Sequence, residues 1–501
     1  MPKRILTTPP LYVKKHEWSK RLSVYCLIIF FLLNVTGYLY YYDDMSNSLL
    51  INPSGMFTKQ CDYTDVKIDL DIEYDLRPEN VEQIESIEIE TTLIESETTT
   101  ITTESEIDIE EKIEIIDEEI NKKYCGKSKC EFLFAYYQPE QETKANMHFR
   151  SFVNLAQALG RTMVLTNVGS SRINSCQNFT FGFYYNAKAL QDMFPDVKFI
   201  SQKDFQNWLK ERRQKPNTEH AYILPGELDY KMELVKPYPD ILKTKNCLNR
   251  FDFNLDDNTI FKQFNTGKNF SKDPVKHQQF ADFLVNNLKT DVEILLTSHF
   301  VFHPLFPNVS SPIPYANHYF DEAAKITNRI KPYVAIHWRM ERANISMLNE
   351  CSEALVKRIS QLKDSLGIKN VYIATDYPIG GGKTQSQTFH LLTDEHHNSM
   401  KLLNSTFNVN SWVSSNIFSS LRNDETIEKE FLGAGMPGIV DKLVCMDADY
   451  FLATPEGCGR ARSTYTTMII DARNVSMQYG ERPQLKNIVE RWIQYPEAGE
   501  N

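Results

Sequence analysis

The sequence predicts an α/β protein with two facing, doubly wound halves, preceded by a single transmembrane helix and a disordered acidic stalk. Short apolar runs alternate with helical patterns between residues 131 and 166, and the alternation returns between residues 333 and 375. This pattern predicts strands joined by crossover helices. A long uncharged segment near the N-terminus predicts the membrane helix. The chain of 501 residues is long enough for one large domain or two medium ones with substantial cores.

The uncharged segment runs from Leu22 to Tyr42. As a helix rising about 1.5 Å per residue, it can cross a hydrocarbon layer roughly 30 Å thick. Lysine and arginine residues precede it and Asp43 and Asp44 follow it, so residues 1–21 are expected to be cytosolic. A cleaved signal peptide is the alternative, but the apolar run is longer than a usual signal sequence and no small-x-small cleavage site follows it. We therefore expect residues 22–42 to anchor the protein in a membrane.

Residues 43–123 are expected to form a stalk rich in threonine, glutamate and isoleucine. Between Asp62 and Lys123 there are 22 acidic side chains and five basic ones. Because like charges repel and nothing nearby balances them, we predict a solvated, extended segment. The acidic excess behind the net charge of −11 therefore belongs to the stalk, and the rest of the chain is mildly basic. No basic stripe outside the N-terminal tail supports binding to nucleic acid.

Sequons and cysteines both indicate that the large domain lies in the lumen of the secretory pathway. Sequons of the form Asn-x-Ser/Thr begin at Asn178, Asn269, Asn308, Asn344, Asn404 and Asn474. Eight cysteines follow the anchor, at positions 61, 125, 130, 176, 247, 351, 445 and 458, and an oxidising lumen allows them to form disulfides. Cys125 and Cys130 are close enough for a small loop, whereas the other pairings stay open. A zinc site is a weaker alternative, because no second close Cys/His pair is present.

The first half is assigned to residues 124–315. Its opening unit is a strand over residues 131–137, a polar loop over 138–146, a helix over 148–159 and a second strand over 162–166. These elements in this order form the building block of a parallel sheet. The stretch from residue 200 to residue 305 is mostly helical in its pattern.

The second half is assigned to residues 316–490, with a short tail over 491–501. Its expected elements are a strand over 333–337, a helix over 352–366, a strand over 371–375, a further strand within 443–452 and a helix that opens at Ser463. Ligands of such sheets bind beyond the carboxyl ends of the strands. We therefore expect a ligand in a cleft between the two halves.

The most informative motif is the strand end from Tyr333 to Glu341, which reads YVAIHWRME. The buried strand ends and at once presents His337, Arg339 and Glu341, which an extended chain places on one side. A guanidinium is permanently charged and can bond two oxygens at once, so Arg339 suits a diphosphate. An ion pair between Arg339 and Glu341 that caps the strand is an equally good interpretation.

Two later segments also place polar residues after a strand. Asp376 follows the strand over 371–375 and can accept a hydrogen bond from a ribose or a base, although an Asx turn is its more ordinary role. The glycine-rich segment 380–384 lacks the spacing of a phosphate-binding loop and is predicted to be a flexible loop. Ser463 and Thr464 open a helix whose N-terminus can hold phosphate oxygens, but an N-cap is the simpler role of Ser463.

Taken together and in this order, these segments resemble the GDP-fucose O-fucosyltransferase superfamily. The strand followed by His337-Trp-Arg339-Met-Glu341 is the specific match. The strand ending in Asp376 and the helix start Ser463-Thr464-Tyr465 resemble the later nucleotide-sugar segments of the family. Asn146-Met-His148-Phe, followed by a helix, resembles the opening unit. The resemblance covers roughly residues 130–475.

The resemblance implies a GT-B fold, an inverting transfer from GDP-fucose, and no required metal or other cofactor. Arg339 corresponds to the arginine near the β-phosphate, which stabilises charge as GDP leaves. His337 and Asp376 are expected to hold the nucleotide, and Ser463, Thr464 and Tyr465 the phosphates. Weaker site residues in the opening loop are Glu142, Asn146 and His148. Glu142 and Glu341 are the candidates for a general base, and the loose fit to the family pattern also permits a mechanism without one.

Two departures from the family pattern bear on this site. Lys144 stands where an asparagine is expected, which affects the contacts to the fucose. Asn344 begins a sequon three residues after Glu341, so a glycan attached there has to point away from the cleft.

The sequence therefore predicts an enzyme that transfers fucose from GDP-fucose to a hydroxyl of a protein or a glycan in the lumen. A short tail, an anchor, a stalk and a catalytic domain suit a type II membrane enzyme of the Golgi or the endoplasmic reticulum. One alternative is a non-catalytic lumenal or cell-surface binding protein on the same fold. Another is a transferase that uses a different nucleotide sugar, such as GDP-mannose.

Overall fold

The structure is a computed structural model. It describes residues 104–226, 231–235, 259–267, 270–299, 303–307, 312–379, 381, 384, 386, 389–419, 424–460 and 463–487. The chain divides into two compact units, residues 1–97 and 98–501, and all described residues belong to the second. The predicted cytosolic tail, the anchor over residues 22–42, most of the stalk and the tail over 491–501 lie outside the described residues. Within the described part, no helix is both long and apolar enough to cross a membrane.

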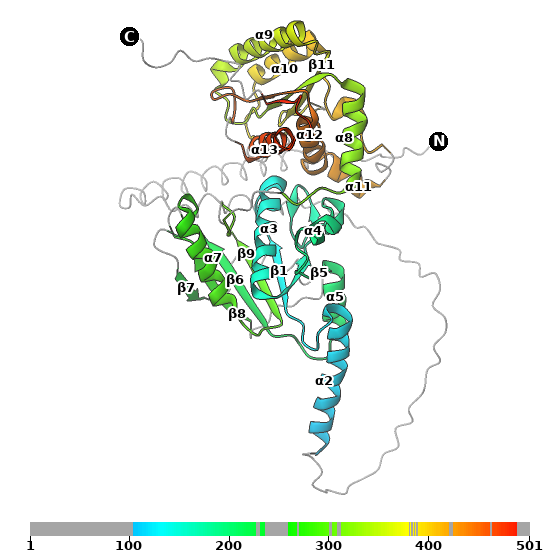
Figure 1. The fold of residues 1–501 in the computed structure, drawn as a ribbon, viewed down its shortest axis with the longest axis vertical. Coiled ribbons are helices and arrows are strands. Elements are labelled where there is room, and N and C mark those ends of the chain that lie inside the picture. The colour runs from blue at the N-terminus through cyan, green and yellow to red at the C-terminus, as the bar shows by residue number, and fades with distance from the viewer. Residues whose placement is uncertain are drawn as a thin grey trace, which may run out of the picture. The chain divides into compact units, whose positions relative to one another are not determined.

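The described residues form two larger sheets covered by helices (Figure 1). The strands are β1 Phe132–Tyr137, β2 Thr162–Leu165, β3 Val168–Gly169, β4 Arg172–Ile173, β5 Phe199–Ser201, β6 Thr218–Leu224, β7 Lys231–Leu234, β8 Ile260–Asn265, β9 Ile294–His299, β10 Tyr333–Trp338, β11 Asn370–Thr375, β12 Tyr450–Ala453 and β13 Lys486–Asn487. The α-helices are α2 Glu104–Cys125, α3 Glu142–Leu159, α4 Ala187–Met193, α5 Gln202–Glu211, α7 Pro274–Leu288, α8 Asn317–Ile330, α9 Leu348–Leu366, α10 Asp394–Phe407, α11 Glu425–Phe431, α12 Gly435–Asp447 and α13 Thr464–Gln478.

The first sheet, in what we call the N-terminal half, has seven strands in the order β5-β2-β1-β9-β6-β8-β7. Every neighbouring pair is parallel except β7 with β8. Alternate residues of β1 serve opposite faces, as the period of a strand requires. Leu133 and Ala135 pack into the core that contains residues of α3 and α7, whereas Phe132 and Phe134 pack into the core that contains residues of α5.

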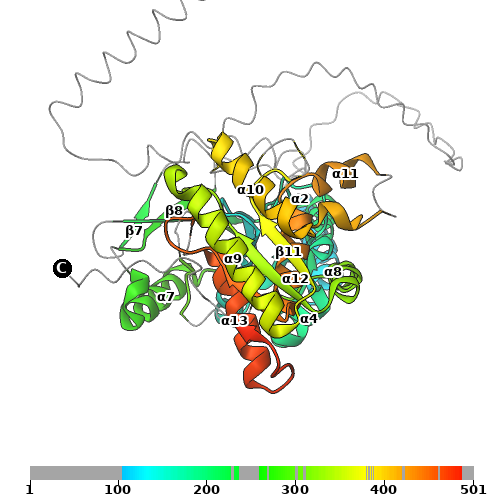
Figure 2. The ribbon, with the colours of Figure 1, turned by 90° about the horizontal axis from the view of Figure 1, so that it is seen from above.

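The second sheet, in the C-terminal half, is wholly parallel in the order β11-β10-β12-β13. Val334, Ile336 and Trp338 of β10 pack with α9 and α10. Tyr333 and Ala335 face the opposite way and pack with α12 and α8. Figure 2 shows α9 and α10 side by side, next to β11. The α/β fold with parallel sheets that the sequence predicts is confirmed.

The prediction of an extended stalk is wrong for residues 104–123, which belong to helix α2. The acidic residues near the end of α2 find partners on α5 and the loop after it. The Asp117 carboxylate pairs with Nε of Arg212 at 2.9 Å and accepts hydrogen bonds from the backbone N–H groups of Arg213 and Gln214. The side chain of Asn121 accepts a hydrogen bond from the Trp208 indole at 2.8 Å. These partners are about 90 residues away along the chain, so the local charge pattern gave no sign of them.

Three further boundaries differ from the prediction. The described residues between 200 and 305 are not mostly helical, because β6, β7, β8 and β9 of the first sheet lie there. The periodicity of a short apolar run is the same for a buried strand and for a buried helix segment, so the pattern alone could not identify these strands. Helix α3 begins at Glu142, inside the predicted loop. The apolar run after Leu443 belongs to α12, and the strand expected within 443–452 is confined to β12.

Two disulfides lie among the described residues. Cys125–Cys130 closes the small loop that the spacing predicts. Cys351–Cys458 ties α9 to the loop that follows β12. Cys176 is also disulfide-bonded, whereas Cys445 is a buried free thiol in α12.

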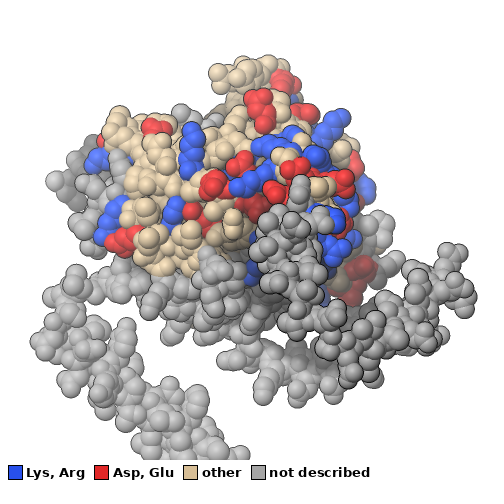
Figure 3. Space-filling model, turned by 90° about the horizontal axis from the view of Figure 1, so that it is seen from below, with Lys and Arg blue, Asp and Glu red and all other residues tan. Residues whose placement is uncertain are grey.

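The two halves share a continuous buried core rather than meeting only through solvent-exposed groups. The core that holds Leu133 of β1 also holds Ile439 and Val440 of α12. A polar contact accompanies it, because Glu430 of the C-terminal half accepts hydrogen bonds from the hydroxyl of Tyr184 and from the backbone N–H of Ser170. On the face seen in Figure 3, basic and acidic side chains of the described residues are interspersed.

Candidate functional site

The carboxyl end of β10 presents the predicted motif. His337 lies near the end of the strand, opposite Ala374 of β11 and Ala453 of β12. Its side chain is buried, its Nδ1 lies 2.8 Å from the Thr466 hydroxyl, and its ring packs on Tyr465 with centroids 4.6 Å apart. Burial, together with the positive charge of Arg339, lowers the pKa of His337 to about 3. The imidazole is therefore neutral at physiological pH.

Arg339 and Glu341 form the ion pair that the sequence offered as an interpretation. Nε of Arg339 lies 2.7 Å from Oε1 of Glu341, whose side chain is completely buried. Nη1 of Arg339 also donates to the Ser463 hydroxyl at 3.3 Å. A second guanidinium, that of Arg460, donates to the same Oε1 atom at 2.8 Å. The other carboxylate oxygen accepts a hydrogen bond from Ser386.

The loop after β12 is bound tightly against the end of β10. The hydroxyl of Thr454 accepts a hydrogen bond from the backbone N–H of Arg339 at 2.9 Å and donates to the carbonyl of His337 at 2.6 Å. The backbone N–H of Arg460 donates to the Arg339 carbonyl at 2.9 Å. Gly459 passes so close to that carbonyl that a Cβ atom would overlap its oxygen. This loop therefore fixes the backbone of Arg339 and carries Arg460 to it.

Asp376 is buried at the end of β11 and supports the same strand end. Its two oxygens accept hydrogen bonds from the backbone N–H groups of Met340 at 2.7 Å and Glu341 at 3.1 Å. Burial raises the pKa of Asp376 to about 6, although these hydrogen bonds act in the opposite direction. The contacts make Asp376 a positioning residue for the segment that carries Arg339 and Glu341.

Ser463 is the N-cap of α13, as its simpler interpretation predicted. Its hydroxyl accepts from the backbone N–H of Thr466 while it receives the hydrogen bond from Arg339. Thr464 is the first residue of the helix and is half-buried. The hydroxyl of Tyr465 donates to the Gly438 carbonyl at 2.7 Å, so this side chain joins α13 to α12. The N-terminus of α13 thus lies beside the Arg339 guanidinium, where its dipole favours an anion.

The predicted residues of the opening loop lie in α3, and one of them, Glu142, contacts the C-terminal half. Glu142 accepts hydrogen bonds from Tyr185 at 3.1 Å and Tyr315 at 2.9 Å, and pairs with Lys442 at 2.7 Å. The Asn146 side chain donates to the carbonyl of Ile313 and accepts from its N–H. His148 is buried in the same helix.

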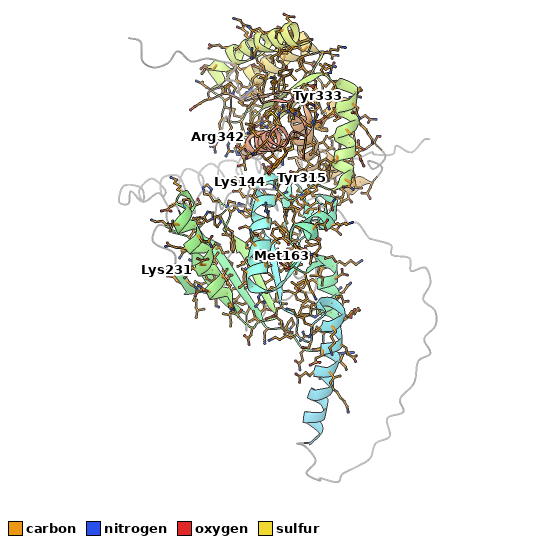
Figure 4. All side chains as sticks on the ribbon, viewed as in Figure 1. Lys144, Met163, Lys231, Tyr315, Tyr333 and Arg342 are labelled. Carbon is orange, nitrogen blue, oxygen red and sulfur yellow. A yellow bond between two sulfur atoms is a disulfide. The ribbon has the colours of Figure 1, made fainter. Side chains whose placement is uncertain are left out.

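Lys144 brings a third cation from the N-terminal half. It forms an ion pair with Glu140 at 3.3 Å, and its pKa is lowered, chiefly by burial, with the positive charges of Arg460 and Arg339 acting in the same direction. Figure 4 places Lys144 and Tyr315 at the end of α3 that contacts α13. The site therefore gathers positive charge from both halves of the chain.

A sequence model of the GDP-fucose protein O-fucosyltransferase family matches residues 144–464, more than half of the chain. The chain belongs to this family. The matched range contains His337, Arg339, Glu341, Asp376 and Arg460, and it ends at the first residue of α13. No curated protein sequence matches the chain.

Solved structures similar to this fucosyltransferase include those of POFUT1 and NodZ. The apo form of POFUT1 is 12% identical, with a TM-score of 0.41, and the match covers 69% of this chain and 95% of that one. POFUT1 in complex with GDP-fucose is 12% identical, with a TM-score of 0.40 and coverage of 69% and 95%. The fucosyltransferase NodZ from Bradyrhizobium is 9% identical, with a TM-score of 0.35 and coverage of 68% and 92%.

Four residues of this fucosyltransferase site were missed from the sequence. Thr454 and Thr466 hold the β10 end through side-chain hydrogen bonds, Arg460 shares Glu341, and Lys442 binds Glu142. The sequence does mark Lys442 as unusual, because Lys442 and Asp441 are the two charged residues in the otherwise apolar stretch GMPGIVDKLVC. The indication for Arg460 is weaker: it is an arginine between Gly459 and the helix start at Ser463. Among the described residues, no three His, Cys, Asp or Glu side chains gather as they would around a metal ion.

Proposed function

We propose that the protein transfers fucose from GDP-fucose to a hydroxyl group of a protein or a glycan, with inversion at the sugar carbon and without a metal. The observation that carries this is the placement of Arg339. It lies at the carboxyl end of a parallel strand, anchored by the buried Glu341 and hydrogen-bonded to the N-cap of α13. Parallel sheets bind nucleotides beyond this edge, and helix N-termini bind phosphate.

The diphosphate fits between Arg339 and the first turn of α13. A guanidinium donates two parallel hydrogen bonds to phosphate oxygens, and the backbone N–H groups at a helix start add donors with a favourable dipole. His337 is neutral and buried behind this position, so it offers a hydrogen-bonding ring to the nucleoside without adding charge. We assign the nucleotide sugar to residues 316–490 and the acceptor to residues 124–315, in a GT-B arrangement.

The reaction follows from this placement. The acceptor oxygen attacks the sugar carbon from the face opposite the diphosphate, the bond from that carbon to the phosphate oxygen breaks, and GDP leaves with the bonding electrons. Negative charge develops on the β-phosphate, where Arg339 and the start of α13 stabilise it. Both oxygens of Glu142 and of Glu341 are held by other side chains. This favours transfer of the hydroxyl proton to the departing diphosphate or to water.

The decisive experiment uses the full-length chain purified in detergent. We expect it to bind GDP and to turn over GDP-fucose, and we expect Arg339→Ala to lose about 100- to 1,000-fold in turnover, as removal of an electrostatic stabiliser typically does. Arg329→Ala removes an exposed guanidinium on α8 of the same half and is the matched control. Equal turnover in Arg339→Ala and in the control would reject the assignment of Arg339.

Three additional arms separate the alternatives. GDP binding without turnover would favour a non-catalytic binding protein, and faster turnover of GDP-mannose would favour another donor. Activity that persists after EDTA treatment is expected for a metal-independent transfer. Strict dependence on manganese would contradict it.

We also propose that residues 22–42 anchor the protein in the Golgi or endoplasmic reticulum membrane with the catalytic domain in the lumen. The disulfides support an oxidising compartment. The sequon residues within the described part, Asn178, Asn344, Asn404 and Asn474, are exposed. Digestion of the full-length protein with a glycosidase should lower its apparent mass, and no change in mass would count against a lumenal domain.

A further inference from the structure

We propose that Arg460 is a second diphosphate-binding residue, held in position by Glu341 and acting beside Arg339. This rests on the proposed function, because it assumes that the anion at the end of β10 is the diphosphate of GDP-fucose. Arg460 belongs to the loop after β12, three residues before the N-cap of α13. It therefore comes from a different segment than Arg339 and reaches the same carboxylate.

The first argument is geometric. Nη1 of Arg460 and Nε of Arg339 lie 2.8 Å and 2.7 Å from the same oxygen, Oε1 of Glu341. The two guanidinium groups therefore share one carboxylate oxygen and are close neighbours. The carboxylate is completely buried, whereas the Arg460 side chain is 27% exposed and the Arg339 side chain 18% exposed. Both side chains therefore keep some surface that a ligand can reach.

The second argument concerns charge. One buried carboxylate needs one cation to compensate it, and Arg339 meets that need together with the hydrogen bond from Ser386. The guanidinium of Arg460 is the second cation on this one carboxylate. Within the described part of the chain, Arg460 has no second carboxylate partner. Because two neighbouring guanidinium groups repel each other, a diphosphate that binds both relieves this repulsion.

The third argument concerns donors. A guanidinium has five N–H donors in a rigid fork. Among the described residues, the Arg460 side chain makes one hydrogen bond, from Nη1 to Glu341. The remaining donors suit phosphate oxygens, which accept such forks in pairs.

The fourth argument is that Arg460 is held firmly. Its backbone N–H donates to the Arg339 carbonyl at 2.9 Å, and Gly459 makes its close approach to that carbonyl immediately before it. Cys458 is bonded to Cys351 of α9, and its carbonyl accepts a hydrogen bond from the Trp338 indole. A cation fixed in this way loses little conformational freedom when it binds an anion, which favours affinity.

The test compares ligands that differ only in phosphate number. The affinities of guanosine, GMP and GDP are measured by calorimetry for the full-length wild type, Arg460→Gln and Arg460→Lys, with Arg329→Gln as the control for loss of one guanidinium. For Arg460→Gln we expect GDP affinity to fall about 10- to 100-fold, the usual range for a lost charged hydrogen bond. GMP affinity should fall less and guanosine affinity should not change. Arg460→Lys should recover part of the GDP affinity, and Arg329→Gln should match the wild type.

A purely structural role predicts a different pattern. If Arg460 serves only to hold Glu341 and the loop, its loss disturbs the whole site, and guanosine affinity falls by the same factor as GDP affinity. That result, or GDP affinity unchanged in Arg460→Gln, would overturn this inference and leave the proposed function intact. Failure of the wild type to bind GDP would instead reject the proposed function. Unchanged guanosine binding in Arg460→Gln also shows that the variant is folded.

Discussion

Lys442 of α12 and Glu142 of α3 form an ion pair of 2.7 Å between residues 300 positions apart in the chain. The lysine side chain has no exposed surface, and its ammonium also reaches the hydroxyl groups of Thr143 and Tyr315. Glu142 in turn accepts hydrogen bonds from Tyr185 and Tyr315. The pair joins the N-terminal half to the C-terminal half, so the two sides of the active site are fixed by a satisfied buried network.

Removing one member of this pair should destabilise the fold strongly. In Lys442→Met the Glu142 carboxylate stays buried without its cation, which typically costs about 3–5 kcal/mol. Urea unfolding followed by tryptophan fluorescence measures the loss. Lys429→Met is the matched control, because it breaks an exposed pair with Glu425, which is worth less than about 1 kcal/mol.

The double variant Lys442→Met/Glu142→Gln tests the interpretation of that loss. With no charge left in the network, much of the lost stability should return, since the cost of Lys442→Met arises from an uncompensated carboxylate. A double variant as unstable as Lys442→Met would mean that the lysine stabilises the contact by packing rather than by charge.

Asp441, next to Lys442, should make stability depend on pH. Its side chain is buried beside the Tyr372 hydroxyl, which donates to it, and near the Cys445 thiol. Burial raises the pKa of Asp441 from 3.8 to about 8. The folded state therefore keeps a proton that the unfolded chain releases, and this contribution to stability is full below about pH 4 and lost as the pH rises through 8.

The variant Asp441→Asn removes this titration while keeping the acceptor for Tyr372. Relative to the wild type, its free energy of unfolding should rise between about pH 4 and pH 8 and level off above that, by on the order of 5 kcal/mol in total. Unfolding curves at several pH values give the difference. Asp471→Asn changes an exposed position on α13. Its free energy of unfolding should depend on pH in the same way as that of the wild type. If the free energy of unfolding of Asp441→Asn also depends on pH as that of the wild type does, the prediction is contradicted.

Local pattern was enough to predict the strands and the residues at their ends. The runs at 132–137, 333–338 and 370–375 are buried on both faces and therefore largely apolar, and the polar residues that follow them lie at one edge of each sheet. The interpretation of Arg339 and Glu341 as an ion pair was also within reach, because the two side chains are two positions apart.

What local pattern missed depends on partners distant in the chain. Asp117 of helix α2 pairs with Arg212, which follows α5, and Glu142 pairs with Lys442. Arg460 reaches Glu341 across 119 positions. No periodicity encodes such pairings, since they arise only when the crossover connections bring separate strand ends to the same edge.

The disulfide Cys351–Cys458 should support the active-site loop as well as the fold. It closes a loop over 107 positions. The chain-entropy model predicts that such a disulfide stabilises the folded state by about 4–5 kcal/mol. We expect Cys351→Ala/Cys458→Ala to lower both the midpoint of unfolding and the affinity for GDP. Cys125→Ala/Cys130→Ala is the control, because it opens a loop over five positions worth about 2 kcal/mol, away from the β10 end. Equal GDP affinities in the two double variants would mean that the loop holds its position without the covalent link.

Gly459 should be essential for the site because of its close approach to Arg339. A Cβ atom at this position would overlap the Arg339 carbonyl oxygen and come within 2.9 Å of Cγ2 of Thr454. Since both neighbours are fixed by hydrogen bonds, Gly459→Ala must push the loop away from β10. We expect GDP affinity and turnover to fall at least about 10-fold, a change of about 1.4 kcal/mol in binding.

Gly438→Ala is the matched control for this substitution. Gly438 lies inside α12, and the space that the alanine methyl group would occupy is open. Alanine should therefore stabilise the helix by about 1 kcal/mol and leave GDP binding unchanged. Calorimetric GDP titrations and thermal unfolding of both variants make the comparison. If Gly459→Ala binds GDP as tightly as Gly438→Ala, the loop after β12 does not position Arg339, and the hydrogen bond from Arg460 to its carbonyl is dispensable for the site.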